Sequence, residues 1–541
     1  MRQEFDYVII GSGSAGSVLA ERLSADPAVS VCVLEAGPRD WSPFIHIPAG
    51  FIKTFQNPRL NWCYTQEPGP NTNGRRLLAP RGKVVGGSSS INGHIYNRGQ
   101  ATDYDTWAQL GNHGWSYADV LPSFKKLERR IGAGDPEYRG REGALTVTDL
   151  EDRHPLCEAF IKGCNEFGIP SNADYNGASH LGISYAQRTI RKGCRVSAAT
   201  AFLNPALRRA NIELCTNAHV TRLIVAGKRV TGVEYLAGGR RGAVQRISAR
   251  CEVILSAGAY NSPQILELSG IGRPDVLQAQ GIEVRHALSG VGEALQDHFA
   301  PRTVVRVKNI HTINELSRGA SLGIEILKWI TARRGILALS PTLVYCSWTS
   351  GVTSEEGDIQ FTFTPASYDD GVIGRLAPTP GITVAVWQQR PESRGHVHID
   401  SKDPFAAPRI QHNYLASTLD QRVVVAGMRM ARELLQSEPL RPYYDFEEFP
   451  GAGVESDADF LAAARAKGNS TFHPAGSCAM GPDPACGAVV NPKLQVHGLQ
   501  GLRIVDASVV PRMISGNLNA VATMIGDRAA DFILAEKRHA A

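Results

Sequence analysis

The feature that most constrains the fold is a glycine-rich turn between an apolar run and an amphipathic segment near the start of the chain. Phe5–Ile10 is short and apolar, as is typical of a parallel strand covered on both faces. Gly11, Gly13 and Gly16 follow it as G-x-G-x-x-G. The first glycine permits a tight turn, the second lets a pyrophosphate approach the backbone, and the third lets the helix pack closely on the strand. The sequence therefore predicts a βαβ unit that binds a dinucleotide.

The second strand of this unit ends in an acid. Val31–Leu34 is apolar, and Glu35 follows it, 19 residues beyond Gly16. A carboxylate at this position can accept both ribose hydroxyls of a dinucleotide. The helix between the two strands would direct its free N–H groups and the positive end of its dipole at the phosphates.

Composition places the chain among ordinary globular proteins. Its 541 residues exceed what one core usually holds, so at least two domains are expected. It is 43% hydrophobic and 20% charged, and its net charge of +5 is spread along the chain, so no nucleic-acid partner is expected. No apolar stretch reaches the roughly 18 residues of a membrane span. The first strand begins at Phe5, which leaves no room for a signal peptide, so a cytoplasmic location is expected.

No metal site or disulfide is expected. The ten cysteines include no C-x-x-C and no zinc spacing. His396 and His398 share one face of a predicted strand and could ligate a metal. Without a third ligand nearby, an ordinary surface pair is favoured.

Three further segments have features of this first unit. Gly86–Ser89 offers consecutive backbone N–H groups and hydroxyls, which would form a second anion cradle. Residues 252–272 read as a strand, a glycine turn and a helix that starts at Ser262-Pro263. At the end of the chain, Gly501–Val505 reads as a short strand and about 520–535 as a terminal helix, as in the first unit.

The middle of the chain has a different character. From about 300 to 465, alternating runs are broken by Pro- and Gly-rich turns and by one clear helix, Leu419–Leu435. This pattern predicts an antiparallel sheet with helices against it, as a second domain. The predicted fold class is therefore α/β: a Rossmann-like domain assembled from discontinuous segments, plus an α+β domain. The segments expected are 1–155, 196–300 and 466–541 for the Rossmann-like domain, and 156–195 and 301–465 for the second.

Four blocks, in order and over essentially the whole chain, resemble one family. They are GSGSAG with LEAG at 34–37, GKVVGGSSSIN at 82–92, GAYNSPQILELSGIG at 258–272, and HPAGSCAMG at 473–481 followed by DASVVP and GNLNA. The chain resembles the glucose–methanol–choline (GMC) flavoprotein oxidoreductases. Within that family it is most similar to bacterial FAD-dependent alcohol and polyol dehydrogenases such as L-sorbose dehydrogenase, and it is also similar to choline dehydrogenase and hydroxymethylfurfural oxidase.

The resemblance implies FAD rather than NAD as the cofactor. It implies that the first glycine turn holds the pyrophosphate with Gly87 nearby, that 92–95 runs along the isoalloxazine, and that Val220 contacts adenine. Asp506 would lie beside the ribityl–phosphate region. The FAD-binding residues implied are Gly11, Gly13, Ser14, Ala15, Gly16, Glu35, Ala36, Trp62, Gly87, Ser88, Asn92, Gly93, His94, Ile95, Val220, Ala257, Phe472, Asp506, Ala507 and Asn519.

Three positions carry further expectations from the resemblance. Ile91 stands where some members link a histidine covalently to FAD, so non-covalent FAD is expected. His94 stands where the family usually has an apolar residue, and whether it would touch flavin or substrate is open. Phe472 stands where the family often has an aromatic beside the flavin, and it could shape the substrate site or only pack.

The chemistry expected is oxidation of a small alcohol. An alcohol gives up hydride readily only if its hydroxyl proton also leaves, so the site needs a base, a partner for the oxygen, and flavin N5 close to the carbon. His473 is the candidate base, because the ordinary pKa of an imidazole suits proton transfer near neutrality. Asn519 is the candidate partner, since its amide can donate to the substrate oxygen, although it could also cap the terminal helix. That helix start could stabilise the reduced flavin.

Other functions remain as alternatives. The electron acceptor could be a quinone, a dye or O2, and the similarity to sorbose and choline dehydrogenases favours a dehydrogenase over an oxidase that makes hydrogen peroxide. Some plant members are hydroxynitrile lyases, whereas the family's light-driven decarboxylases lack the His473 and Asn519 pair. A flavin-binding module without activity and a nicotinamide-dependent enzyme are disfavoured. The substrate is open among polyols, choline, aryl, furanic and heteroaromatic alcohols.

Overall fold

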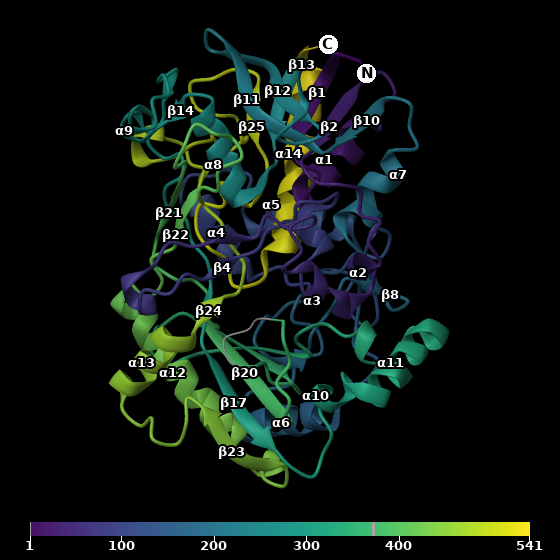
Figure 1. The fold of residues 1–541 in the computed structure, drawn as a ribbon, viewed down its shortest axis with the longest axis vertical. Coiled ribbons are helices and arrows are strands. Elements are labelled where there is room, and N and C mark those ends of the chain that lie inside the picture. The colour runs from purple at the N-terminus through teal and green to yellow at the C-terminus, as the bar shows by residue number, and fades with distance from the viewer. Residues whose placement is uncertain (1, 370–373, 541) are drawn as a thin grey trace.

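The computed structural model describes residues 2–369 and 374–540, without the side chains of the last two. Two sheets organise the chain, one in the upper half and one in the lower half of Figure 1. The sequence prediction of fold class is confirmed: the first sheet is Rossmann-like and the second is antiparallel.

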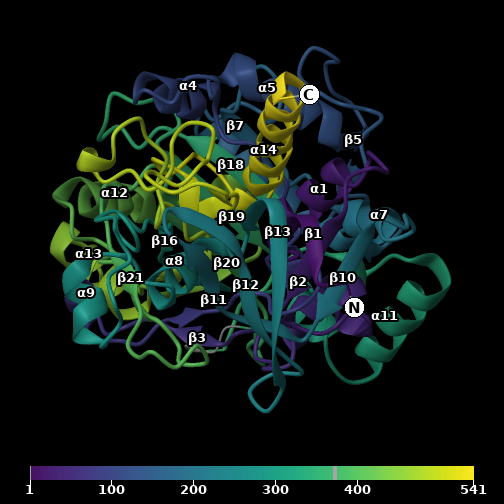
Figure 2. The same ribbon diagram turned by 90° about the horizontal axis from the view of Figure 1, so that it is seen from above.

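The first sheet has seven strands, of which five are parallel to one another. Its order is β10-β2-β1-β13, with β25 paired to the second half of β13 and the antiparallel hairpin β12-β11 paired to its first half. Figure 2 shows β13 running the length of this sheet beside β1. The strands are β1 (Glu4–Ile10), β2 (Val31–Glu35), β10 (Ile212–Thr216), β11 (Ala218–Ala226), β12 (Arg229–Ala237), β13 (Ala243–Leu255) and β25 (Leu502–Ile504).

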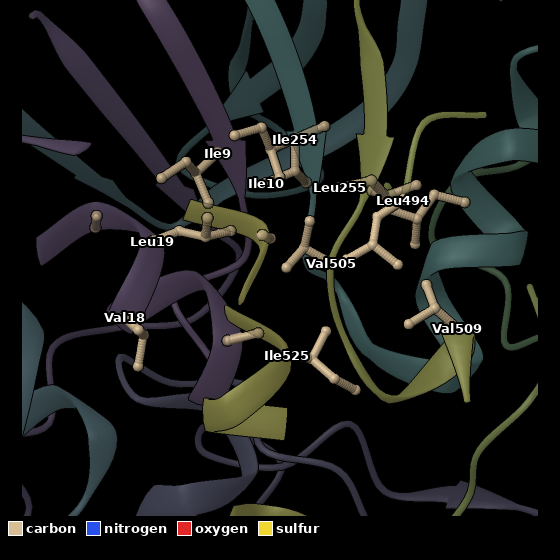
Figure 3. Close-up of a cluster of buried hydrophobic side chains, with 14 of the residues drawn as sticks. Ile9, Ile10, Val18, Leu19, Ile254, Leu255, Leu494, Val505, Val509 and Ile525 are labelled. Carbon is tan, nitrogen blue, oxygen red and sulfur yellow. The ribbon is translucent and has the colours of Figure 1, made fainter. Parts of the chain in front are cut away.

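Two helices from opposite ends of the chain cover this sheet together. Helix α1 (Ser14–Leu23) follows the glycine turn, and helix α14 (Leu518–Ala540) packs along it. A Cβ atom at Gly526 would lie 2.7 Å from the Ala15 carbonyl oxygen, so glycine is what lets α14 approach α1 this closely. Figure 3 shows apolar side chains of β1, β13, α1 and α14 meeting in one buried cluster, including Ile9, Ile254, Leu19 and Ile525.

The second sheet is antiparallel, with the order β23-β17-β20-β19-β18-β7. Successive side chains along each strand point to opposite faces of this sheet. On β20, Ile382, Val384 and Val386 enter a core with helix α12 (Thr418–Leu435), whereas the residues between them face a cavity. Helices α6 (Pro155–Glu166) and α13 (Asp457–Lys467) also pack against α12. The strands are β7 (Gly182–Tyr185), β17 (Arg302–Val307), β18 (Val344–Trp348), β19 (Ile359–Thr364), β20 (Gly381–Gln388) and β23 (Tyr444–Phe449).

Most of the expected elements form, and two differ. The predicted strand that carries His396 and His398 is β21 (His396–His398), which pairs only with β22 (Arg409–Gln411) outside the second sheet. Helix α8 spans Gly258–Leu268 and so begins before Ser262-Pro263. Pro263 lacks the N–H that would bond to the Ala259 carbonyl, and the Ser477 hydroxyl donates to that carbonyl instead, at 2.5 Å. The helix can therefore continue through the proline.

Two absences can be stated for the part of the chain that the structure describes. None of its helices combines the length and the apolar character needed to cross a bilayer. None of its clusters of His, Cys, Asp and Glu could hold a metal ion. The strands of the first sheet come from 1–155, 196–300 and 466–541, but the domain boundaries themselves stay a prediction.

Candidate active site

A cavity of about 1290 Å³ lies between the first sheet and the inner face of the second. The residues predicted from the sequence come from nine separate parts of the chain, and the structure gathers them on its wall, with the exception of Gly16. That glycine serves the turn itself, since a Cβ atom there would lie 2.1 Å from the Gly11 carbonyl oxygen.

The two glycine turns meet at one point of this wall. Gly11 adopts a φ of +98°, and a Cβ atom there would lie 2.4 Å from the Ser256 carbonyl oxygen. Gly87, at the start of a short helix over Gly87–Ser90, has a φ of +54°, and its added Cβ would lie 2.7 Å from the Cα of Gly13. Both turns thus present bare backbone to the cavity beside the first turn of α1. This is an arrangement suited to a pyrophosphate.

Glu35 is buried at the end of β2 and lines the cavity. Its Oε2 accepts hydrogen bonds from the backbone N–H and the hydroxyl of Ser12, at 3.1 and 2.6 Å, and its Oε1 accepts one from Gly37, at 2.9 Å. Burial raises the pKa of Glu35, while these hydrogen bonds oppose the rise. Oε1 keeps a free acceptor position, so the carboxylate can still accept from a ribose hydroxyl.

Aromatic rings line the cavity near Val220, at the start of β11. The ring of Trp62 stacks on Tyr64 with 5.6 Å between centroids and meets His219 edge-on at 5.8 Å. Lys83 Nζ lies 4.7 Å from the Trp62 ring centre. An apolar wall of this kind suits a flat heterocycle such as adenine.

Asp506 links the end of β25 to the start of α8. Its Oδ2 accepts from the Gly258 N–H at 2.9 Å and from the Ser262 hydroxyl at 2.6 Å. Burial raises its pKa, and the hydrogen bonds from Ser262 and Ser508 oppose this. Ala257 and Ala507 line the cavity beside it with small side chains.

The segment 91–95 crosses the cavity wall in a tight conformation. His94 has a φ of +68° and is fully buried. Its Nε2 donates to the Pro48 carbonyl at 3.0 Å, and its buried Nδ1 has no partner among the described residues. Burial lowers its pKa well below the ordinary value, so this imidazole is neutral. A Cβ atom at Gly93 would lie 2.7 Å from Pro341, which explains the glycine before it.

His473 is held by a chain of hydrogen bonds that fixes where its protons sit. His298 Nε2 lies 2.8 Å from the Gln389 carbonyl, which can only accept, so this nitrogen carries the proton. The bare Nδ1 of His298 lies 3.1 Å from His473 Nδ1, which also lies 2.8 Å from the Thr471 hydroxyl. His473 Nδ1 is therefore the donor, and its Nε2 is left as an acceptor at the cavity wall.

The surroundings keep this imidazole neutral. Burial, the neighbouring His298 and the cation of Arg81 together lower the pKa of His473 well below its ordinary value. Arg81 donates to the Phe472 carbonyl at 2.6 Å. Asp297 accepts the backbone N–H of His473 at 2.7 Å. Phe472 itself has a φ of +67° and meets Phe55 edge-on, with 5.0 Å between ring centroids.

The amide beside His473 belongs to Asn517, not to Asn519. Asn517 Nδ2 donates to His473 Nε2 at 2.9 Å. Asn519 lies in the first turn of α14, where its Oδ1 accepts from the Ser14 hydroxyl at 2.8 Å. Pairing Asn519 with His473 from the sequence is therefore corrected. Asn519 still lines the cavity, on the side of the first glycine turn.

Sequence reasoning missed four residues of this arrangement. Asn517 lay in the block GNLNA, where two asparagines alternate and the helix start was set too late to choose between them. His298, Thr471 and Arg81 carry no local signal, because only the fold brings His298 and Arg81 to His473.

Comparisons with known proteins agree with this geometry. The profile described as GMC oxidoreductase matches residues 5–300 with its N-terminal part and 391–526 with its C-terminal part. An alcohol dehydrogenase [acceptor] of Pseudomonas putida is 38% identical over 536 residues, covering 98% of this chain and 96% of that protein. An oxygen-dependent choline dehydrogenase of Sinorhizobium medicae is 41% identical over 536 residues, with the same coverage of 98% and 96%.

Solved structures give the same result. Pyridoxine 4-oxidase from Mesorbium loti superposes with a TM-score of 0.88 at 28% identity, covering 97% of this chain and 98% of that one. Formate oxidase of Aspergillus oryzae, a structure concerned with FAD modification, superposes with a TM-score of 0.91 at 25% identity, covering 99% of each chain. The cavity, its glycine turns and these matches agree on one conclusion: the chain is an FAD-dependent enzyme that belongs to the GMC oxidoreductase family.

Proposed function

We propose that the protein oxidises the CH–OH group of a small alcohol to an aldehyde or ketone, with His473 as the base. The observation that carries this proposal is the neutral imidazole of His473, whose Nε2 lone pair lies beside the Asn517 amide. Its Nδ1 donates its proton to His298 and to the Thr471 hydroxyl. Relatives named as alcohol and choline dehydrogenases support an alcohol as the substrate class.

FAD, held non-covalently between the two glycine turns, Glu35 and Asp506, supplies a two-electron hydride acceptor. His473 Nε2 takes the hydroxyl proton, and the Asn517 amide donates to the oxygen as its negative charge grows. His298 accepts from His473 Nδ1 and so stabilises the imidazolium that forms. The alcohol loses one proton and one hydride, and the two electrons leave through an external acceptor. A quinone or dye is proposed over O2.

The test is anaerobic bleaching of the visible flavin band by pools of polyols, choline, aryl alcohols and furans. Wild type and the control His113→Ala, which changes an exposed imidazole outside the cavity, should bleach equally with an active pool. His473→Ala should keep its flavin and reduce it about 10²-fold more slowly or worse. Bleaching of His473→Ala at the wild-type rate would refute His473 as the base. Slow return of the flavin band of the wild type in air would support a dehydrogenase over an oxidase.

A further inference from the structure

The inner face of the second sheet carries two arginines on one strand, and only Arg306 has a hydrogen-bonding partner among the described side chains. On β17, Thr303, Val305 and Val307 are buried, while Arg302, Val304 and Arg306 line the cavity. Arg306 pairs with Glu448 at 2.6 Å and donates to the Ser367 hydroxyl at 2.7 Å. Arg302 makes no ion pair or side-chain hydrogen bond with any residue of the described ranges 2–369 and 374–540.

No carboxylate of the described ranges forms an ion pair with Arg302. Burial lowers the pKa of Arg302, and the single group that raises it is the phenol of Tyr368. An arginine side chain stays protonated at neutral pH even so. A half-buried guanidinium without a counter-charge is costly for the folded protein, and its five N–H groups offer a planar fork to a bound ligand.

The neighbours of Arg302 leave room for such a ligand. Arg302 is directly opposite Ala385 on β20, and Ala385 is opposite Thr362 on β19. Both are small residues of the cavity wall. The cross-strand neighbours of Arg302 on the sheet are therefore small, and the large side chain near its guanidinium is that of Tyr368.

The rest of the wall is also positively charged on this side. The ionised side chains that line the cavity in the described ranges are Arg75, Arg76, Arg81, Arg302, Arg306, Lys467, Glu35, Asp369, Glu448 and Asp506. Glu35 and Asp506 lie at the glycine turns, and Glu448 and Asp369 pair with Arg306 and Arg375. Arg76 pairs with Glu67 as well, whereas Arg75, Arg81 and Arg302 form no ion pair with a described residue, so this part of the described wall favours an anion over a cation.

Arg302 makes no hydrogen bond to His473. It is four residues beyond His298, so their Cα atoms are at most about 13 Å apart. The neighbouring groups that lower the pKa of His473 are His298 and Arg81, and Arg302 is not among them. Arg302 and His473 are thus close enough for separate groups of one small molecule to reach both.

We propose that Arg302 binds the carboxylate of the substrate, so that the alcohol oxidised here is a hydroxy acid whose carboxylate and carbinol lie at opposite ends. This inference rests on the proposed function for the carbinol end. A single unpaired guanidinium matches a singly charged carboxylate, with which it forms two parallel hydrogen bonds. A quaternary ammonium alcohol such as choline meets the wrong charge at this position.

The first test compares matched substrates with holoenzyme. The kcat/KM for 4-(hydroxymethyl)benzoate should exceed that for its methyl ester by about tenfold or more, and choline should be the poorest of the three. Arg302→Gln should lose this preference for the acid, because its KM for the acid rises. Arg302→Lys should retain part of the preference. The control Arg441→Gln, which changes an exposed arginine, should retain all of it. A wild-type enzyme that uses ester and acid equally would overturn the inference while leaving alcohol oxidation intact.

The second test needs no turnover and so separates the two proposals. Terephthalate, which has no hydroxyl, is titrated against wild type and Arg302→Gln by calorimetry at low and high salt. Binding should weaken about tenfold in Arg302→Gln and with added salt. Equal affinities of wild type and Arg302→Gln for terephthalate would refute the anion site, even if alcohols bleach the flavin. Arg302-dependent binding without bleaching by any alcohol would keep the site and refute the proposed function.

Discussion

Replacing Asn517 by alanine is the most informative change at the base, because the amide has one partner. Its Nδ2 donates to His473 Nε2 at 2.9 Å, and its buried Oδ1 has no partner among the described residues. Alanine therefore removes one donor and leaves no buried hydrogen-bonding group unpaired other than Nε2 itself. The effect should fall on the chemical step rather than on stability.

The size of the effect follows from the role of the donor. If the amide stabilises the growing charge on the substrate oxygen, its loss should cost about 2.7–4 kcal/mol, which is a 10²–10³-fold slower flavin reduction. Asn519→Ala loses a neutral hydrogen bond to the Ser14 hydroxyl, worth about 1 kcal/mol. It should slow reduction by no more than about fivefold and should show mainly as weaker FAD retention.

Anaerobic stopped-flow of flavin reduction at saturating alcohol measures both variants. The flavin content of each is recorded first, so that loss of cofactor is not read as loss of chemistry. A larger rate loss in Asn519→Ala than in Asn517→Ala would refute the assignment of the amide and return the partner role to Asn519.

Three further predictions concern charge and backbone. Arg81→Gln removes a cation that lowers the pKa of His473, so the acid limb of the flavin reduction rate should move to higher pH; an unmoved limb would contradict this. Gly87→Ala places a Cβ 2.7 Å from Gly13 Cα at a positive φ, so the purified variant should lack the flavin band, whereas Ser90→Ala should retain it. Burial opposes protonation of His398, but hydrogen bonds to Glu267 and Glu293 raise its pKa to about 9. Its contribution to the free energy of unfolding, at most about 3 kcal/mol, should be complete below pH 6.5 and lost as the pH rises through 9. The Tm difference between wild type and His398→Gln should shrink over that range, and a constant difference would refute the coupling.

The sequence predicted what local patterns determine. The turn at Gly11, Gly13 and Gly16 needs only neighbouring residues, and the structure has the strand, turn and helix expected there. The start of α8 was misplaced because the rule that proline begins a helix ignores a distant donor, and Ser477 satisfies the carbonyl that Pro263 leaves free.

What depends on the register of distant segments was not predictable. The amide beside His473 was assigned to the wrong asparagine, because a shift of two residues at the start of α14 moves the side chain from the base to the first glycine turn. The face of β17 that carries Arg302 is defined only by its pairing with β20. No spacing in the chain reveals that pairing.

The most direct test of the central claim, that a neutral His473 removes the hydroxyl proton as hydride leaves the carbinol carbon, is the rate of flavin reduction against pH for an alcohol with hydrogen or deuterium at that carbon. Deuterium should slow reduction several-fold in wild type. The rate should stay constant through pH 6.5 and fall only at lower pH, because the pKa of His473 lies well below its ordinary value. His473→Ala should keep the isotope effect but lose both the speed and the acid limb. An acid limb that survives in His473→Ala would assign the proton to another group and contradict the account.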